Sequence, residues 1–159
     1  MVQIRKIEVK DNQAMERIIK QSLESFGLDI PGTAYYDPQL SYLEEFYRDK
    51  INASYWVAVN EKDDVLGGVG IGPFGQEADV GELQKLYVTP EVQGRGIAKK
   101  LMDVALDFAK DHYTYCYLET SHKLEAANLL YSKLGFVERD KPLEGSEHGT
   151  MDKWYIKEL

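Results

Sequence analysis

Apolar residues recur at spacings of three and four in several long stretches of this chain, the pattern of helices that bury one face. The first stretch follows Asp11, a residue type that favours the N-cap position, and carries Met15, Ile18, Ile19, Leu23 and Phe26. Further helices are predicted over residues 39–49, after the glycines at 94 and 96, and from Leu124 to an end at Gly135.

Shorter apolar or alternating stretches, bounded by turn-forming residues, predict strands. They cover residues 4–9, 54–59, 65–71, 81–88, 115–120, 136–138 and 151–156. The polar turn 60–64 joins two of them, so we expect an antiparallel hairpin there. The stretch 67–72 is rich in glycine but is followed by Pro73 and not by a helix. We therefore expect a strand whose small residues admit a neighbouring group.

The predicted order is strand, two helices, a hairpin, strand, helix, strand, helix and two final strands. This order favours an α+β fold of three layers, with helices on both faces of a mixed, mostly antiparallel central sheet. A length of 159 residues is about that of one domain. We expect a single domain over residues 1–159, since no linker, repeat or low-complexity segment interrupts the chain.

Composition and charge narrow the classes of function. Hydrophobic residues make up 43% and charged residues 29% of the chain, as in ordinary folded soluble proteins. A net charge of −8 opposes general nucleic-acid affinity, because phosphate binding needs concentrated Lys and Arg. No apolar run approaches the roughly 20 residues that span a bilayer, and the N-terminus lacks the apolar stretch of a signal peptide. We expect a cytoplasmic protein with no nucleic-acid or membrane partner.

Cysteine and histidine usage argues against a disulfide and a metal centre. Cys116 is the only cysteine, which excludes an intrachain disulfide and is compatible with a reducing compartment. Its apolar and aromatic neighbours indicate a small buried side chain and not a nucleophile. His112, His122 and His148 show no spacing typical of a metal cluster, so we predict no metal.

A glycine-rich turn follows the strand 81–88. Gly94 and Gly96 lack Cβ atoms where a backbone could approach a ligand closely, and the first turn of the next helix leaves N–H groups without acceptors. These donors and the helix dipole suit a pyrophosphate. Arg95, Lys99 and Lys100 form a basic island beside them. The alternative is a tight reversal without a ligand. The dinucleotide fingerprint fails because Lys99 replaces its third glycine, and no Walker pattern follows.

The residues 93–98, Gln-Gly-Arg-Gly-Ile-Ala, match the Gln/Arg-x-x-Gly-x-Gly/Ala signature of the GNAT superfamily of acyl-CoA N-acyltransferases. Residues 82–88 resemble the fourth strand of that family, and residues 125–136 resemble its last helix and the Gly-Phe that ends it. The resemblance spans most of the chain from Ser54 onward and is strongest over residues 82–136. It implies a GNAT-like sheet with a splayed strand pair, and acetyl-CoA as cosubstrate.

The resemblance also implies which residues hold acetyl-CoA. The backbone of Leu86, Tyr87 and Val88 would pair with pantetheine. The pyrophosphate would be surrounded by Val92, Gln93, Gly94, Arg95, Gly96, Ile97 and Ala98. Asn128 would lie against the cofactor, on the same helical face as Tyr131 three residues later.

Amine acetylation needs two proton transfers, because an ammonium must lose a proton and the departing thiolate is better released protonated. The resemblance places Tyr131 near the sulfur as the candidate general acid; a core aromatic is the alternative. Glu82 occupies a strand position that is a glutamate general base in some members. A solvated surface charge is the alternative for Glu82, and an ordered water or His148 would then be the base.

The N-terminal third usually shapes the acceptor pocket in this family, and here the resemblance transfers no residue. Candidates for aromatic pocket walls are Tyr35, Tyr36, Tyr42 and Trp56, with core packing as the alternative for Trp56. Carboxylates of this third favour a small cationic amine, unless they are ordinary solvated surface. They are Glu24, Asp29, Asp37, Glu44, Glu45 and Asp49.

The sequence therefore predicts an N-acetyltransferase that moves an acetyl group from acetyl-CoA to a primary amine of a small molecule or peptide by direct attack. A non-catalytic acyl-CoA-binding regulatory module is the alternative, since it needs the glycine turn but neither Tyr131 nor Glu82. The sequence leaves open the acceptor, the use of other acyl groups and the oligomeric state, for which a homodimer is one option.

Overall fold

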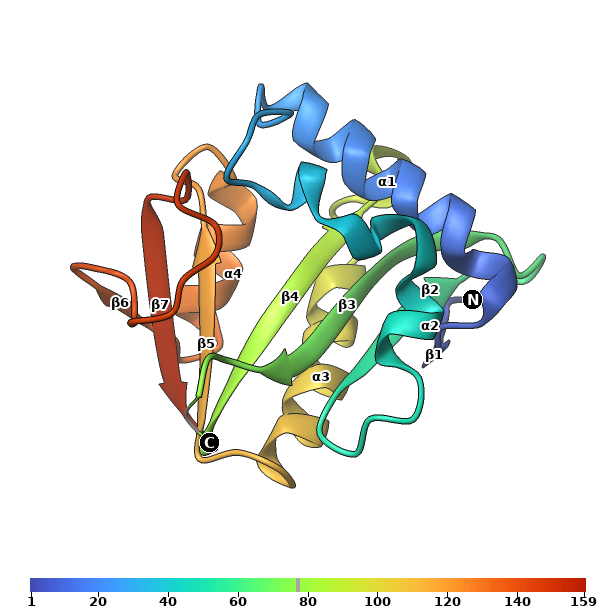
Figure 1. Ribbon diagram of the computed structural model, residues 1–159. Coiled ribbons are helices and arrows are strands. Elements are labelled where there is room, and N and C mark those ends of the chain that lie inside the picture. The colour runs from blue at the N-terminus through green and yellow to red at the C-terminus, as the bar shows by residue number, and fades with distance from the viewer. Residues whose placement is uncertain (77) are drawn as a thin grey trace.

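The computed structural model describes residues 1–76 and 78–159 and is built around one seven-stranded sheet (Figure 1). The strand order is β1-β2-β3-β4-β5-β7-β6. The strands are β1 (Gln3–Lys6), β2 (Ser54–Val59), β3 (Val65–Pro73), β4 (Val80–Val88), β5 (Tyr115–Thr120), β6 (Val137–Arg139) and β7 (Lys153–Glu158). Neighbouring strands are antiparallel except β4 and β5, which are parallel. The predicted mixed, mostly antiparallel sheet and its β2–β3 hairpin are confirmed.

Helices cover both faces of the sheet, as predicted. They are α1 (Asn12–Ser25), α2 (Leu43–Tyr47), α3 (Ile97–Lys110) and α4 (Glu125–Lys133), with short 3-10 turns η1 (Val9–Asp11), η2 (Ala34–Tyr36), η3 (Pro38–Tyr42) and η4 (Pro90–Val92). In Figure 1, α1 and α2 lie in front of the sheet, and α3 and α4 lie behind it. Within the described residues, no helix is both long enough and apolar enough to cross a membrane.

Each face of the sheet has its own apolar core. On one face Met15 and Leu23 of α1 pack with Val57 of β2. On the other face Leu101 of α3 packs with Ile71 of β3. The three- and four-residue spacing of the helices therefore supplies one layer to each face of the sheet.

Cys116, expected to be buried, and Trp56, a candidate for a pocket wall, both lie in the core between α3 and the sheet. Cys116 is completely buried there, and burial raises the pKa of its thiol to about 12, so it is the small buried side chain that was expected. Trp56 is buried against Phe108 with ring centroids 5.2 Å apart, and it packs in the core, not in a pocket wall.

The prediction of one helix over residues 39–49 is wrong. The 3-10 turn η3 runs to Tyr42, and the α-helix begins only at Leu43. The Oδ1 atom of Asn12 accepts a hydrogen bond from the backbone N–H of Glu44 at 2.9 Å. A side chain of α1 therefore satisfies one of the free N–H groups in the first turn of α2, an interaction that the local sequence does not reveal.

Some strand boundaries also differ from the prediction. β1 ends at Lys6 because residues 9–11 form a 3-10 turn, whereas the prediction continued the strand to Val9. The last two strands begin later than predicted, at Val137 and Lys153.

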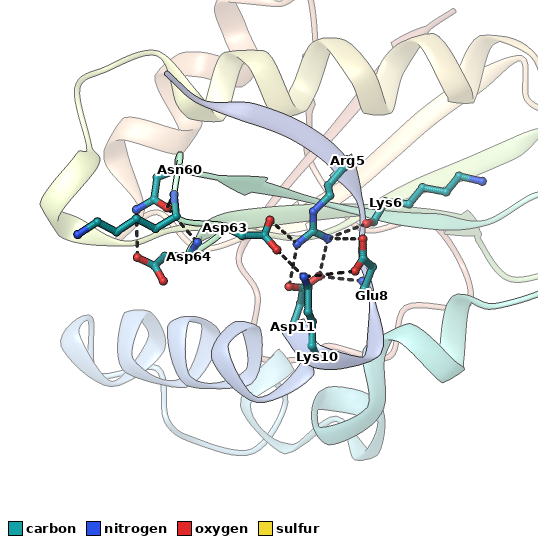
Figure 2. Close-up of polar contacts among 9 residues, drawn as sticks. Arg5, Lys6, Glu8, Lys10, Asp11, Asn60, Asp63 and Asp64 are labelled. Atoms are coloured by element: carbon teal, nitrogen blue, oxygen red, sulfur yellow. Dashed lines mark hydrogen bonds and ion pairs between the residues drawn. The ribbon is translucent and has the colours of Figure 1, made fainter.

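A buried ion pair ties the N-terminal strand to the start of α1 (Figure 2). Asp11 occupies the predicted N-cap position of α1, but its side chain makes no capping bond. Its carboxylate instead accepts hydrogen bonds from Arg5 at 2.7 Å and from the Glu8 backbone N–H at 2.8 Å. Arg5 also donates to Asp63 in the β2–β3 turn at 3.1 Å. These bonds hold β1, the hairpin turn and α1 together.

The glycines of β3 make room for two tyrosine rings, as the sequence suggested. A Cβ atom on Gly68 would lie 2.6 Å from the Tyr55 ring, and one on Gly70 would lie 2.8 Å from the Tyr47 hydroxyl. Both distances are shorter than real contacts allow. A side chain at either position would therefore force the neighbouring ring to move.

Candidate active site

The parallel strands β4 and β5 separate after a short paired segment. They pair only where Val80, Gly81 and Glu82 face Tyr115, Cys116 and Tyr117. In Figure 1 the two strands diverge beyond that segment, so the rest of β4 has an open backbone edge on this side. The splay that the resemblance implied is therefore present.

A cavity of about 520 Å³ occupies the splay. Its lining comes from β4, the glycine turn, β5 and α4. The predicted site residues among the lining are Leu86, Tyr87, Val88, Val92, Gln93, Gly94, Gly96, Ile97, Ala98 and Tyr131. The predicted residues Arg95 and Asn128 do not line it.

The glycine turn adopts the backbone that only glycine takes easily. The φ angles of Gly94 and Gly96 are +84° and +77°, and a Cβ atom on either residue would meet nothing within 4 Å. In the described chain, the successive backbone N–H groups of residues 94–99 donate no hydrogen bond, and the first bond of α3 runs from Lys100 N–H to the Gly96 carbonyl. The turn thus presents free donors and the positive end of a helix beside the cavity.

Asn128 is bonded within the protein. Its Nδ2 atom donates to the carbonyls of Ser121 and Leu124, each at 2.9 Å, and its Oδ1 atom accepts from the Tyr155 hydroxyl at 2.9 Å. In the structure, Asn128 therefore joins α4 to the preceding loop and to β7.

Tyr131 belongs both to the cavity wall and to the core. It is buried and packs edge-on against Phe136, with ring centroids 5.9 Å apart. Its hydroxyl has no hydrogen-bond partner among the residues that the structure describes. Burial, with a smaller contribution from Tyr87, raises the pKa of this hydroxyl well above the usual tyrosine value. The group therefore stays protonated at neutral pH.

A bulge in β4 lies between Glu82 and the residues 86–88 that were predicted to contact pantetheine. Gly68 pairs with Tyr87 and Gly70 pairs with Gln84, so two residues of β4 oppose one residue of β3. Lys85 lies in this bulge with a φ of +52°, and its carbonyl accepts a hydrogen bond from Tyr55 at 2.8 Å. The extra residue shifts the alternation of side chains along β4.

A second cavity, of about 100 Å³, adjoins the first. Its lining includes polar side chains from four parts of the chain: Asp37, Gln39, Glu82, Gln84, Lys85, Glu119, Glu147 and His148. Leu83, Lys85, Tyr87 and Glu119 are among the residues that line both cavities. The two cavities therefore meet across β4.

Glu82 lies in the wall of the second cavity, and the pKa of its carboxyl is raised. Burial raises the pKa of its carboxyl to about 7; the hydrogen bond from Gln84 lowers the pKa, and the negative charge of Glu119 raises it. The Gln84 amide nitrogen donates to Glu82 Oε1 at 2.9 Å, while its oxygen accepts from the Tyr47 hydroxyl. A carboxyl with a pKa near 7 exchanges a proton readily at neutral pH.

His148 reaches the same cavity but is paired with Asp37. Its Nε2 atom lies 3.1 Å from both carboxylate oxygens of Asp37, and Lys85 Nζ lies 2.8 Å from Asp37 Oδ2. The hydrogen bond to Asp37 raises the pKa of His148. Burial alone would raise the pKa of Asp37, but His148 and Lys85 together lower it. Sequence reasoning named His148 but missed this cluster, whose members lie far apart in the chain.

Most of the N-terminal residues proposed for the acceptor pocket lie elsewhere. Neither cavity is lined by Tyr35, Tyr36, Tyr42 or Trp56. Of the acidic residues proposed there, only Asp37 lines either of these two cavities. Glu44 instead pairs with Arg48, and Glu45 accepts from Asn12. Among the described residues there is also no grouping of three or more His, Cys, Asp or Glu side chains that could hold a metal ion.

Comparison with known proteins identifies the class to which this fold and site belong. The model of the acetyltransferase (GNAT) family matches residues 14–136. The chain belongs to the GNAT family of acetyltransferases and is an acyltransferase.

Among individual relatives, the chain is 38% identical to the uncharacterized N-acetyltransferase YjgM of Escherichia coli (strain K12), over 98% of this chain and 94% of that protein. It is 31% identical to the N-acetylaspartate synthetase of Xenopus tropicalis, over 74% of this chain but only 45% of that protein.

Solved structures share the fold. A GNAT-family acetyltransferase of Staphylococcus aureus Mu50 superposes with a TM-score of 0.86 at 22% identity, covering 100% of this chain and 99% of that chain. The PaiA N-acetyltransferase of Thermoplasma acidophilum, solved in complex with coenzyme A, gives a TM-score of 0.74 at 20% identity, covering 100% of this chain and 99% of that chain.

Proposed function

We propose that this enzyme transfers an acetyl group from acetyl-CoA to a primary amine of a small molecule or peptide by direct attack. Glu82 would act as general base and Tyr131 as general acid. The observation that carries the proposal is the position of these two groups, because they line adjoining cavities that meet across β4.

The larger cavity fits acetyl-CoA. Free amides at residues 94–99 would hold the pyrophosphate, and positive φ at Gly94 and Gly96 keeps side chains out of their way. The open edge of β4 at residues 86–88 would pair with pantetheine, because β5 does not pair with it there. The coenzyme A bound by the PaiA relative supports this choice of cosubstrate.

Arg95 and Asn128 have different roles in this proposal. Arg95 is exposed at the turn and would add positive charge near the phosphates without lining the cavity. Asn128 would hold α4 in position through its three internal hydrogen bonds. It thereby sets the position of Tyr131, which lies on the same helix.

Bound acetyl-CoA supplies a thioester carbonyl for the amine to attack and a thiol as leaving group. Glu82 takes the proton that the attacking ammonium must lose. With a pKa of about 7, a substantial fraction of Glu82 is ionised at neutral pH, and it still has useful basicity. His148 is the weaker candidate, because its Nε2 atom faces the Asp37 carboxylate.

Tyr131 provides a proton on the side of the leaving group. Its raised pKa keeps the hydroxyl protonated, and a protonated donor is what the departing sulfur requires. Because the ring is packed against Phe136 and Tyr155, the hydroxyl is fixed relative to α4.

The test is acetyl-CoA-dependent release of free thiol, measured with the purified protein against amino acids, polyamines, aminoglycosides and peptide N-termini. We expect thiol release that depends on at least one amine class, with the acetylated amine found by mass spectrometry. Saturable binding of acetyl-CoA without acetylation of any amine would contradict the proposal.

A further inference from the structure

Glu119 lies near the C-terminal end of β5, after this strand has left β4. It lines both cavities, and its negative charge contributes to the raised pKa of Glu82. Glu119 is therefore close to the position where an acceptor amine would meet the base.

The two carboxylate oxygens of Glu119 have different surroundings. Oε2 accepts a hydrogen bond from the Tyr117 hydroxyl at 2.7 Å, and that hydroxyl accepts one from the Leu143 backbone N–H at 3.0 Å. Oε1 is buried and has no hydrogen-bond partner among the described residues. A buried carboxylate oxygen without a partner is unfavourable and is rare in native structures. Because Oε1 is closed off from the cavity in this conformation, it gains a partner from outside the chain only when the Glu119 side chain turns toward a bound ligand.

The cations of the second cavity are already paired. Lys85 and His148 both bind Asp37, so the positive charges next to the cavity are matched to a carboxylate of the protein. Glu119 forms no ion pair in the described chain, and neither does Glu147, which is exposed at the cavity rim. The unmatched charge of the acceptor cavity is therefore negative, and a cation would complement it.

We propose that Glu119 is a specificity-determining residue that binds a second positively charged nitrogen of the acceptor, so the preferred acceptors are small diamines. This inference rests on the proposed function, in which the first nitrogen is deprotonated by Glu82. The second nitrogen stays charged and binds the Glu119 carboxylate, whose Oε1 turns toward the cavity to accept a charge-assisted hydrogen bond of the stronger kind. An acceptor with a carboxylate at the same place would meet like charge.

The size of the preference follows from the same contact. A site built to pair a polar group of its substrate strongly rejects an analogue that lacks it, because the site is then left unpaired, and we expect a preference of about tenfold or more. Matched acceptors isolate this effect. They are 1,4-diaminobutane, butylamine and 4-aminobutanoate, with diamines of three to six carbons added to find the best length.

The first measurement is kcat/KM for each acceptor by thiol release from acetyl-CoA at constant ionic strength. We expect the best diamine to exceed its monoamine by about tenfold or more, and the amino acid to be poorest. Glu119→Gln keeps the size of the side chain and an oxygen for Tyr117, so the fold should be kept. In this variant the ratio of diamine to monoamine should fall to the statistical advantage of two equivalent ends. The matched control Glu158→Gln, an exposed position at the end of β7, should keep the full ratio.

The second measurement is the stabilisation of the protein against heat by each amine, which needs no turnover. Diamines should raise the melting temperature of the wild type more than monoamines do, and Glu119→Gln should lose this difference. Turnover without a preference for diamines would overturn the role of Glu119 and leave the acetyltransferase proposal standing. A third outcome is that diamines stabilise the wild type preferentially, Glu119→Gln loses this preference, and no amine is turned over. This outcome would support the role of Glu119 and contradict the proposed function. An unchanged ratio in Glu119→Gln, or a preference for 4-aminobutanoate, would overturn the inference.

Discussion

The Nζ atom of Lys85 lies 2.8 Å from Oδ2 of Asp37, and only 5% of the lysine side chain is exposed. Lys85 lies in the bulge of β4, and Asp37 lies between η2 and η3. This ion pair therefore attaches the segment after α1 to the strand that carries Glu82. It forms part of the wall of the proposed acceptor cavity, and the positive charge of Lys85 is paired with the carboxylate of Asp37.

Gly96→Glu should abolish the stabilisation that acetyl-CoA gives to the wild type. A ligand at about 100 times its Kd adds roughly 2.7 kcal/mol to the free energy of unfolding, and the new carboxylate would enter the space meant for phosphates. Gly96→Ala is the control, because it carries the same strain at positive φ without charge or bulk. The measurement is the melting temperature with and without acetyl-CoA. Equal shifts in wild type and folded Gly96→Glu would place the cofactor elsewhere.

Tyr131→Phe removes one hydroxyl and keeps the ring. If the hydroxyl protonates the leaving thiolate, kcat should fall on the order of 10²-fold or more while the Kd for acetyl-CoA changes little. The comparison is Tyr42→Phe, which removes an exposed hydroxyl and should leave kcat alone. Single-turnover kinetics, in which chemistry limits the rate, provide the measurement. Unchanged kcat would assign Tyr131 to the core only.

Activity should depend on the ionisation of Glu82. Because the base must be unprotonated, wild-type kcat/KM should fall as the pH drops below about 7. Glu82→Gln should be much slower at neutral pH and recover partly at high pH, where the acceptor loses its proton unaided. The experiment is a pH profile of both proteins with one acceptor, with Glu138→Gln, an exposed carboxylate, as control. A Glu82→Gln profile equal to that of the wild type would point to a water or His148 as base.

The same carboxyl should also make stability depend on pH. Its pKa rises from 4.5 to about 7 on folding, so the folded state binds this proton more tightly than the unfolded state. The resulting stabilisation is complete below about pH 4.5 and is lost as the pH rises through about 7. Relative to Glu82→Gln, the wild type should lose at most about 3 kcal/mol over this range. Urea unfolding at several pH values measures the difference, and a difference that stays constant with pH would contradict it.

Asp11→Ala should destabilise the fold without touching the cavities. It would remove the buried partner of Arg5, whose side chain is only 16% exposed and would keep only the more exposed Glu8 and Asp63, and the loss of such a hydrogen-bonded partner costs about 1–3 kcal/mol. Lys10→Ala, which removes an exposed partner of Asp63 (Figure 2), should have little effect. Denaturant midpoints compare the two variants. Equal midpoints would mean that the buried pair adds nothing beyond its exposed neighbour.

Local sequence pattern predicted the elements that depend on local features. The strands at residues 54–59 and 115–120 have the predicted bounds, because continuous apolar runs between turn residues define them. Gly135 ends α4 as predicted, with a φ of +90°. The helix at residues 39–49 was wrong because its start depends on Asn12 of α1.

The candidate site also combines features that the local sequence reveals with features that depend on contacts between distant segments. The glycine turn is visible in the sequence because glycine is required by the backbone itself. The pairing of Asp37 with Lys85 and His148 joins three distant segments, and the bulge that carries Lys85 has no glycine to mark it. The acidic residues proposed for the acceptor pocket were misjudged for a related reason, since composition does not tell which side chains a fold pairs with each other.

Gly70 of β3 affects the side chain of its partner residue on β4, Gln84, through the space that it leaves open. Without a side chain at Gly70, the Tyr47 hydroxyl can reach the Gln84 oxygen and fix that amide with its nitrogen toward Glu82. A methyl group there would push the ring aside and release the amide to rotate. The absence of a side chain at Gly70 therefore affects the pKa of Glu82, because it allows Tyr47 to orient the amide that donates to this carboxyl. An engineer who wishes to move the pH optimum of this enzyme can begin at Gly70 and leave the reacting groups untouched.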